Sequence, residues 1–357
     1  MKICLPVIIL SLLISPLLPE ANAQDVHFSQ FYENAPLRNP GLIGIFSGDY
    51  KVAANYRNQW SSFATPFVTA MVSAEVKTLV QPLHGDFVSF GLTVVHDKAG
   101  SIDFNSTSAY GGVNYNKSLG DAHYSYISVG LGAGYIQRSM NVSKMRFANQ
   151  YLGGMYNPDN ASGETFNTSK ISNYDATAGI SFNSSLGWNV NYYIGAAAYH
   201  LSKPKQSYMG AEYIRMSTRI TGSFGLRARI NNTLGLMAVL NYQNQAPYQE
   251  IIGGGLISYF VNNTNNIDQT NKVKIYAGCM YRYKDAIIPT FKIDYKDWGL
   301  TCSYDVSMGN HRIYFNGVGG YEVSLVLRGG IERKKSLVDP LTTPRFELED
   351  DPSKNPY

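Results

Sequence analysis

The feature that most constrains this chain is a two-residue alternation of apolar and polar side chains. In residues 171–185 (ISNYDATAGISFNSS), polar or small residues alternate with apolar ones, which are Tyr174, Ala176, Ala178, Ile180 and Phe182. Such a segment is a strand with one apolar and one polar face. In a soluble protein the apolar face packs on a core, whereas in an outer-membrane barrel it faces lipid.

The same pattern predicts about 14 strands, each near the roughly ten residues that a tilted strand needs to cross a bilayer. A soluble β-sandwich also alternates, but its strands usually have about five or six residues and number roughly seven to nine. We therefore expect an all-β fold, a transmembrane antiparallel β-barrel, rather than a soluble all-β protein. The expected strands are Asp49–Trp60, Phe67–Lys77, Phe87–His96, Phe104–Asn116, His123–Arg138, Asn173–Phe182, Trp188–His200, Arg219–Ile230, Thr233–Gln243, Tyr248–Phe260, Lys272–Tyr283, Ala286–Tyr295, Gly299–Met308 and Tyr321–Arg333.

The first residues have the order of a secretory signal peptide. Lys2 precedes a short apolar run that ends in Ala21-Asn22-Ala23. This order predicts export through the Sec pathway and cleavage between Ala23 and Gln24. A signal anchor is the alternative, although the apolar run is short for spanning a bilayer. The expected division is a signal peptide at 1–23, an N-terminal periplasmic or plug segment at 24–48, a barrel at 49–333 and a polar C-terminal tail at 334–357, extended in the periplasm.

The amino-acid composition agrees with a barrel and argues against a nucleic-acid-binding protein. Charged residues make up 16% of the chain, below the roughly 25% of soluble domains. The 27 Tyr and 33 Gly suit interfacial anchors and curved strands. The net charge of +4 is small and dispersed, so we expect no nucleic-acid partner.

No motif predicts catalysis, a metal or a cofactor. The six histidines lack metal-ligand spacing. The Ser-x-x-Lys match at 202–205 lacks the companion boxes of penicillin-binding enzymes, and the calcium-loop-like stretch 157–164 is broken by Ala161. We expect a protein that is not an enzyme and that binds no cofactor.

The inward-facing charges leave two alternatives, an anion-selective pore or a barrel whose charges pair with acids such as Asp175 and Glu322, or with a plug. The expected basic lumen residues are Arg219, Arg227, Arg229, Lys272, Lys274 and Arg282. The pairing is favoured because charges in a polar lumen need no special function. The two longest connections, Ser139–Ser172 and Leu201–Thr218, both fall on the outside if the N-terminus is periplasmic.

The segment QDVHFSQFYENAPLRNPGLIG and the following NYRNQW resemble the start of the PorP/SprF family of the Bacteroidetes type IX secretion and gliding machinery. A block with Phe147 and Gln150 resembles the family's Phe-x-x-Gln block, and residues 320–325 resemble its final strand. Gly41 departs from the family's usual Ala, and Thr343 from its Cys. The other matching positions are Phe28, Ser29, Gln30, Asn39, Pro40, Tyr56, Arg57, Gln59 and Trp60 near the start, and Pro344, Arg345 and Phe346 near the end.

The resemblance implies a multi-pass outer-membrane barrel that takes part in export or surface anchoring of large adhesins by recognising their C-terminal domains. The implied partners are outer-membrane lipid, a secreted adhesin C-terminal domain and periplasmic ring proteins of the type IX machinery. The alternative is an outer-membrane diffusion channel or small-solute transporter.

Strand register adds an expectation for the N-terminal motif. Arg57 and Gln59 should point into the lumen, and Tyr56 and Trp60 outward or at the rim. The segment Gln24–Pro40 would then form a plug or collar whose aromatic side chains contact Arg57.

Overall fold

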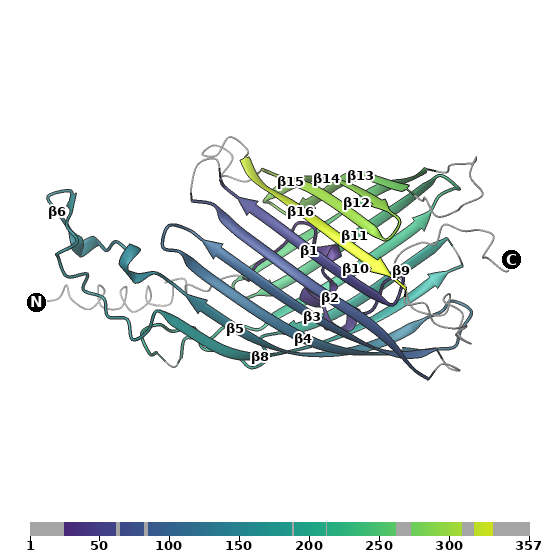
Figure 1. Cartoon of the computed structure of the whole chain (residues 1–357), viewed down its shortest axis with the longest axis horizontal. Coiled ribbons are helices and arrows are strands. Elements are labelled where there is room, and N and C mark those ends of the chain that lie inside the picture. The colour runs from purple at the N-terminus through teal and green to yellow at the C-terminus, as the bar shows by residue number, and fades with distance from the viewer. Residues whose placement is uncertain are drawn as a thin grey trace, which may run out of the picture.

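The structure is a computed structural model of the chain, and it describes residues 25–61, 65–81, 85–187, 189–211, 213–261, 273–308 and 318–330. Within these residues, 14 antiparallel strands close into a barrel (Figure 1). Each strand pairs with its neighbours along the chain, and β1 closes the barrel on β16 with Tyr50 opposite Gly329. The expected all-β barrel is confirmed.

Every expected strand overlaps an observed one. The bounds differ at some ends, because β2 continues to Gln81 and β5 begins only at Tyr126. The starts expected at Trp188 and Lys272 lie outside the described residues. The last strand is described to Gly329, and the bound expected at Arg333 lies outside the described residues. The barrel strands are β1 (Tyr50–Gln59), β2 (Phe67–Gln81), β3 (Asp86–Ala99), β4 (Phe104–Ser118), β5 (Tyr126–Ser139), β8 (Lys170–Leu186), β9 (Val190–Tyr199), β10 (Arg219–Arg229), β11 (Leu234–Gln245), β12 (Tyr248–Val261), β13 (Val273–Arg282), β14 (Ala286–Tyr295), β15 (Trp298–Ser307) and β16 (Val318–Gly329).

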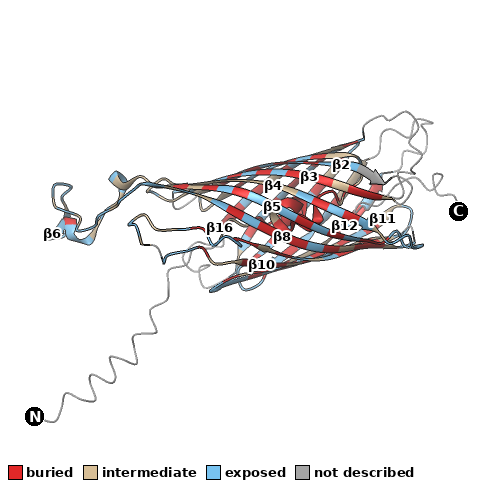
Figure 2. Cartoon of the chain, turned by 90° about the horizontal axis from the view of Figure 1, so that it is seen from below, coloured by how far each residue is buried: buried red, intermediate tan, exposed pale blue. Residues whose placement is uncertain are grey.

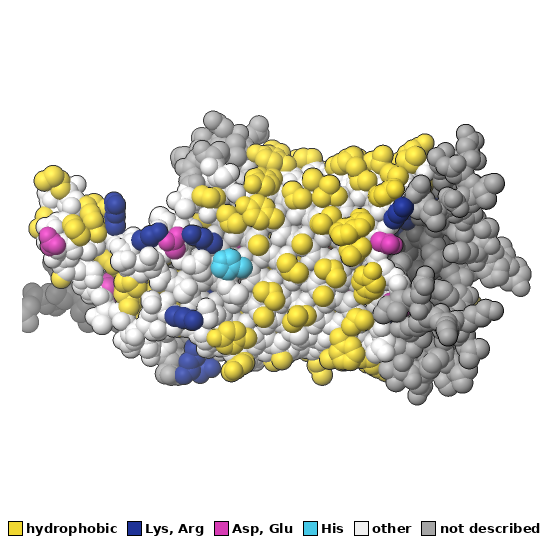
Figure 3. Space-filling view, viewed as in Figure 1, with side chains coloured by type: hydrophobic (Ala, Val, Ile, Leu, Met, Phe, Trp, Pro, Cys, Tyr) yellow, Lys and Arg dark blue, Asp and Glu magenta, His cyan; other side chains and the backbone are white. Residues whose placement is uncertain are grey.

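The strands turn their apolar faces outward and their polar faces inward. In β8, Ile180 is 58% exposed, whereas Asp175 and Thr177 are buried. Buried and exposed residues alternate along the strands in Figure 2, and apolar side chains cover the middle of the outer face in Figure 3. An apolar outer surface around a polar interior is the arrangement of a membrane barrel. None of the helices in the described part of the chain is long and apolar enough to cross a membrane.

Residues 25–48 run through the barrel interior and are called the plug here. They form three short helices, η2 (Phe31–Glu33), α2 (Ala35–Arg38) and η3 (Pro40–Leu42), drawn in purple inside the barrel in Figure 1. Pro36 lies in the first turn of α2 and Pro40 begins η3, and at both positions a missing N–H costs nothing. Plug side chains share a buried apolar cluster with the barrel wall, including Phe31, Leu42, Met237, Ile252 and Leu256.

One end of the barrel carries the longest connections. The β5–β8 connection and the β9–β10 connection leave this end, called the long-loop end here, as the sequence predicted. Residues 140–169, called the arm, extend away from the barrel at the left of Figure 1. The arm contains a small hairpin of β6 (Tyr151–Leu152) and β7 (Met155–Tyr156), which sequence periodicity did not predict.

Candidate functional site

The candidate site is the plug together with the wall that holds it, because the N-terminal motif residues bind there. The backbone N–H groups of Ser29 and Gln30 donate to the two carboxylate oxygens of Glu322 at 2.7 and 3.0 Å. The Gln30 amide also donates to Ser303 Oγ at 2.9 Å and accepts from Ser324. The wall residues belong to β15 and β16, so the start of the described chain is fastened to its last strands.

Two buried arginines surround this contact. Arg57 of β1, only 1% exposed, binds Glu322 at 3.0 Å and Asp305 at 2.7 Å. Arg282 of β13 binds Asp305 at 3.0 Å. The Ser29 hydroxyl donates to Asp305 and accepts from both arginines. Removing one member of such a buried, paired cluster leaves an uncompensated charge.

The Asn-Pro pair seats the plug on the opposite side of the barrel. Asn39 donates through Nδ2 to the Ile180 carbonyl at 3.0 Å and accepts through Oδ1 from the Gly41 N–H at 2.7 Å. A Cβ atom on Gly130 of β5 would lie 2.3 Å from the Pro40 backbone, and one on Gly179 of β8 would lie 2.1 Å from Asn39 Oδ1. These wall positions therefore need glycine for the plug to approach the wall this closely.

Further ion pairs fix the middle of the plug. Glu33 binds Lys292 of β14 at 2.5 Å, and the Glu33 carbonyl accepts from Lys51 at 2.9 Å. Burial would raise the pKa of Glu33, but Lys292 and two other cations outweigh it and lower the pKa to about 2. Glu33 is therefore ionised and paired at neutral pH.

The first described residue joins a histidine cluster near the long-loop end. His200 lies between two carboxylates, with Nε2 2.6 Å from Asp25 and Nδ1 2.7 Å from Asp175. Arg219 and Arg138 also pair with Asp25, at 3.3 and 3.5 Å. Burial lowers the pKa of His200, but the neighbouring carboxylates outweigh it and raise that pKa above its ordinary value.

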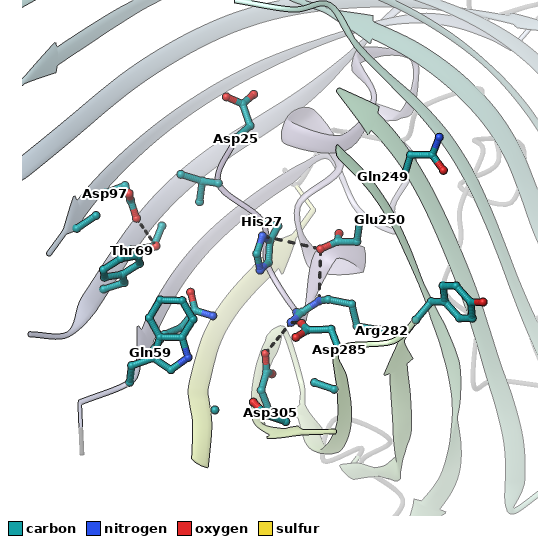
Figure 4. Close-up of a pocket in the computed structure, with 18 of the residues that line it drawn as sticks. Asp25, His27, Gln59, Thr69, Asp97, Gln249, Glu250, Arg282, Asp285 and Asp305 are labelled. Carbon is teal, nitrogen blue, oxygen red and sulfur yellow. Dashed lines mark hydrogen bonds and ion pairs between the residues drawn. The ribbon is translucent and has the colours of Figure 1, made fainter. Parts of the chain in front are cut away.

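A cavity of about 500 Å³ opens at the long-loop end, above the plug (Figure 4). We call it the mouth cavity. Plug residues Asp25 and His27 line it together with Asp97 of β3, Glu250 of β12 and Arg282. Burial and the nearby arginines hold the pKa of His27 well below its ordinary value, so His27 is neutral at pH 7.

The positions selected from the sequence do not all meet. Phe28 packs on Met71 and Val95 inside the barrel. Tyr56 is 41% exposed on the outer face, 6.2 Å from the ring of Tyr321. Gln59 and Trp60 line the mouth cavity, which agrees with the inward and rim positions expected for them.

Other selected positions lie away from the plug. Phe147 and Gln150 belong to the arm, where the Phe147 ring lies 6.2 Å from that of Phe166 and Gln150 donates to the Asn160 carbonyl. The expected cleavage position at Ala23 and Gln24 and the tail positions Pro344, Arg345 and Phe346 lie outside the described residues. The described positions that match the family thus lie in three kinds of place: in the plug, on the barrel wall, where Tyr56 faces outward, and in the arm.

One expected contact is wrong in its chemistry. Arg57 does point into the lumen, but it binds the plug through the Ser29 hydroxyl and not through the neighbouring aromatic rings. The aromatic side chains Phe31 and Tyr32 pack instead in the apolar cluster. The preference for paired lumen charges is supported, since Glu322 and Asp175, named from the sequence, accept from Arg57 and His200.

The sequence reasoning missed several residues that hold the plug. Asp305, Lys292, Gly130 and Gly179 were not selected, although strand alternation places Asp305 and Lys292 on the inner faces of β15 and β14. Among the described residues, no group of three or more His, Cys, Asp and Glu side chains is arranged to hold a metal ion.

The solved structures that this chain resembles are similar to it only at low sequence identity. The Pseudomonas putida toluene transporter TodX is 11% identical, with a TM-score of 0.44 over 82% of this chain and 91% of that chain. A *Pseudomonas aeruginosa* FadL homologue is 11% identical, with a TM-score of 0.45 over 81% and 92%. A comparison with curated proteins gives no significant match.

A family model supplies the assignment that these distant structures do not. The model described as "Type IX secretion system membrane protein PorP/SprF" matches residues 20–327. The match includes the plug and nearly all of the barrel. The chain therefore belongs to the PorP/SprF family of type IX secretion system membrane proteins, and its fold is that of an outer-membrane barrel.

Proposed function

We propose that this protein binds a partner at the long-loop end and takes part in export or surface anchoring of a large secreted adhesin, by recognising the adhesin's C-terminal domain. The long-loop end would face outside, where barrels keep their longer loops. Adhesins of this kind would serve gliding motility. The proposal includes Sec-dependent export with cleavage after Ala23, and contact of the periplasmic side with ring proteins.

The observation that carries this proposal is the seated plug. Its polar groups bind inward-facing charges from opposite sides of the barrel, through Glu322, Lys292 and His200. Inner side chains that are occupied in this way are not available to select a diffusing solute. A lumen that holds such a plug favours a binding role over a diffusion channel or small-solute transporter, which is the competing proposal.

The arm supplies the surface for a partner. Leu152 and Met155 in its hairpin are 65% and 76% exposed, and Tyr213 of the β9–β10 connection is 85% exposed. These side chains lie beyond the strands at the long-loop end and so outside the lipid belt. Exposed apolar groups in water mark interaction sites.

The test is capture from native membranes with a tagged full-length protein. We expect a secreted adhesin and type IX components to co-purify with the wild type. Replacing both Leu152 and Met155 by Ser should reduce adhesin recovery strongly and leave barrel folding unchanged. The matched control replaces Lys170 and Ser172, which are also exposed near the arm, by Ala. Equal adhesin recovery with the arm variant and the wild type would contradict the proposed docking surface.

Conductance distinguishes the competing proposal. In a planar bilayer, the wild-type barrel should be nearly silent, and deletion of Asp25–Asn34 should open it. A wild-type barrel that conducts steadily, with no change on this deletion, would favour the diffusion channel.

A further inference from the structure

The mouth cavity contains two acceptor groups that the chain itself does not fully satisfy. Glu250 is nine-tenths buried, and its Oε1 accepts from Gln243 at 3.0 Å. Its Oε2 forms an ion pair with Arg282 at 3.4 Å and lies 3.8 Å from Nδ1 of the neutral His27. Both distances exceed those of ordinary N–H···O hydrogen bonds. An oxygen of this kind, at the wall of an open cavity, is poised to accept from a ligand.

Asp97 provides the second acceptor, across the cavity from Glu250 in Figure 4. One of its oxygens accepts from Thr69 at 2.6 Å. Among the described residues, no Lys or Arg forms an ion pair with Asp97. A partly buried carboxylate without a cation partner favours a positively charged ligand.

Most of the charged side chains that line the mouth cavity are acidic. Five carboxylates line the mouth cavity, and among the described residues Arg282 is the one lining Lys or Arg. That guanidinium is already engaged, since it binds Asp305 and Asp285 at 3.0 and 2.9 Å. The neutral His27 adds no positive charge. Clefts lined by one sign of charge concentrate ligands of the opposite sign.

The aromatic part of the lining narrows the ligand further. Trp60 and Phe67 form an edge-to-face pair with ring centroids 4.8 Å apart, and both line the cavity. Cations bind favourably over such ring faces, and planar guanidinium groups stack on them. The volume of about 500 Å³ lies within the range of small-ligand sites, about 300–1,000 Å³.

We propose that the mouth cavity binds a cationic group, a guanidinium or an ammonium, between Asp97 of β3 and Glu250 of β12, with the Trp60–Phe67 pair on the same lining. The cation comes either from a basic side chain of a polypeptide or from a small free amine. The polypeptide source rests on the proposed function, because an exported partner would present its side chains at this mouth.

The first experiment needs no variant. The full-length protein in detergent micelles is titrated calorimetrically with the tripeptide Ala-Arg-Ala, blocked at both ends, and with the matched Ala-Gln-Ala. We expect the Arg peptide to bind at least about tenfold more tightly, since a charge-assisted hydrogen bond is lost with Gln. Binding should weaken as salt rises. Equal affinity for the two peptides overturns the proposal.

Variants then locate the site. Asp97→Asn keeps the acceptor for Thr69 but removes the charge, and it should weaken Arg-peptide binding at least about tenfold. Glu250→Gln should weaken it similarly. The matched control is Asp103→Asn, because Asp103 lies at the same end but pairs with Lys98 at 2.9 Å and does not line the mouth cavity. Unchanged affinity in Asp97→Asn, with an unchanged melting temperature, overturns the assigned site.

A third titration separates the two sources. Methylguanidinium that binds within about tenfold of the Arg peptide supports a small free cation as the ligand. A peptide that binds at least about tenfold more tightly supports a polypeptide. Because these assays contain no adhesin, their outcome is independent of whether the arm captures one, so the two proposals fail separately.

Discussion

The substitution Glu322→Gln tests how the plug is fastened, because it changes charge and hydrogen bonding at constant shape. Glu322 is 1% exposed and accepts four hydrogen bonds, two on each oxygen. Oε2 accepts from the Ser29 N–H at 2.7 Å and from Arg57 at 3.0 Å. Oε1 accepts from the Gln30 N–H at 3.0 Å and from Asn55 at 3.3 Å.

In Glu322→Gln an amide nitrogen, which donates and cannot accept, replaces one of the two carboxylate oxygens. In either orientation of the amide, this nitrogen faces two N–H donors and leaves both without an acceptor. Each buried donor left unsatisfied costs about 1–3 kcal/mol. Two such donors give about 2–6 kcal/mol, and Arg57 also loses one of its two carboxylate partners. The affected contacts are those of Glu322 with the plug and with Asn55 and Arg57 of β1, whereas the backbone pairing of β1 with β16 is unchanged, so we expect the plug to detach before the barrel unfolds.

The measurement is urea unfolding in detergent micelles, combined with protease cleavage within residues 25–48. Glu322→Gln should lower the unfolding free energy by the amount above and make the plug cleavable in the otherwise folded barrel. Glu164→Gln, an equally isosteric change at an exposed arm carboxylate, serves as the control and should change nothing. A loss below about 0.5 kcal/mol with an uncleaved plug would refute the reasoning, because it would mean that the four contacts are not made.

The remaining predictions concern the plug's fit and its pH dependence. Gly130→Ala places a Cβ 2.3 Å from the plug backbone and should raise both plug cleavage and bilayer conductance, whereas Gly111→Ala, with open space around its Cβ, should not. Gly41→Ala brings a Cβ to 2.9 Å from the backbone of β8 and should cost about 1–3 kcal/mol in urea unfolding. Because the pKa of Glu33 is lowered to about 2, its contribution to stability is full above the ordinary value and is lost as pH falls from about 4.5 to about 2; Glu33→Gln should remove this part of the acid transition. The pKa of His200 is raised instead, so the contribution of His200 to stability is full below about pH 6.5 and is lost as the pH rises through the folded pKa. His200→Asn should remove this pH dependence. A urea midpoint of the variant that still falls over the same pH range would contradict the prediction.

Much of the barrel could be predicted from the sequence because its strands obey a local rule. In β8 the expected apolar positions Tyr174 and Ile180 are exposed, and the intervening Asp175 is buried. Strands such as β8 and β10 follow this rule along most of their length, whatever their partners are. The small hairpin in the arm was missed because β6 and β7 have two residues each, too few to show any period.

The plug contacts could not be predicted in the same way, because they join residues that are distant in sequence. Nothing near Ser29 indicates that its N–H binds Glu322 or that its hydroxyl binds Asp305. The need for glycine at position 130 becomes visible only once Pro40 is placed against it. The alternation of apolar and polar residues predicted that Arg57 points into the barrel. Its partners are visible only in the three-dimensional structure.

The span of the plug contact has a consequence for the order in which the molecule assembles. Ser29 and Glu322 are 293 positions apart, and β16 is the strand that closes the barrel on β1. The earliest described residues therefore have no complete binding site until the final strand has joined the first. Contacts between residues so far apart in sequence form slowly, so we expect the N-terminal residues to bind in the barrel last. Their binding would then indicate that β16 has paired with β1 and closed the barrel.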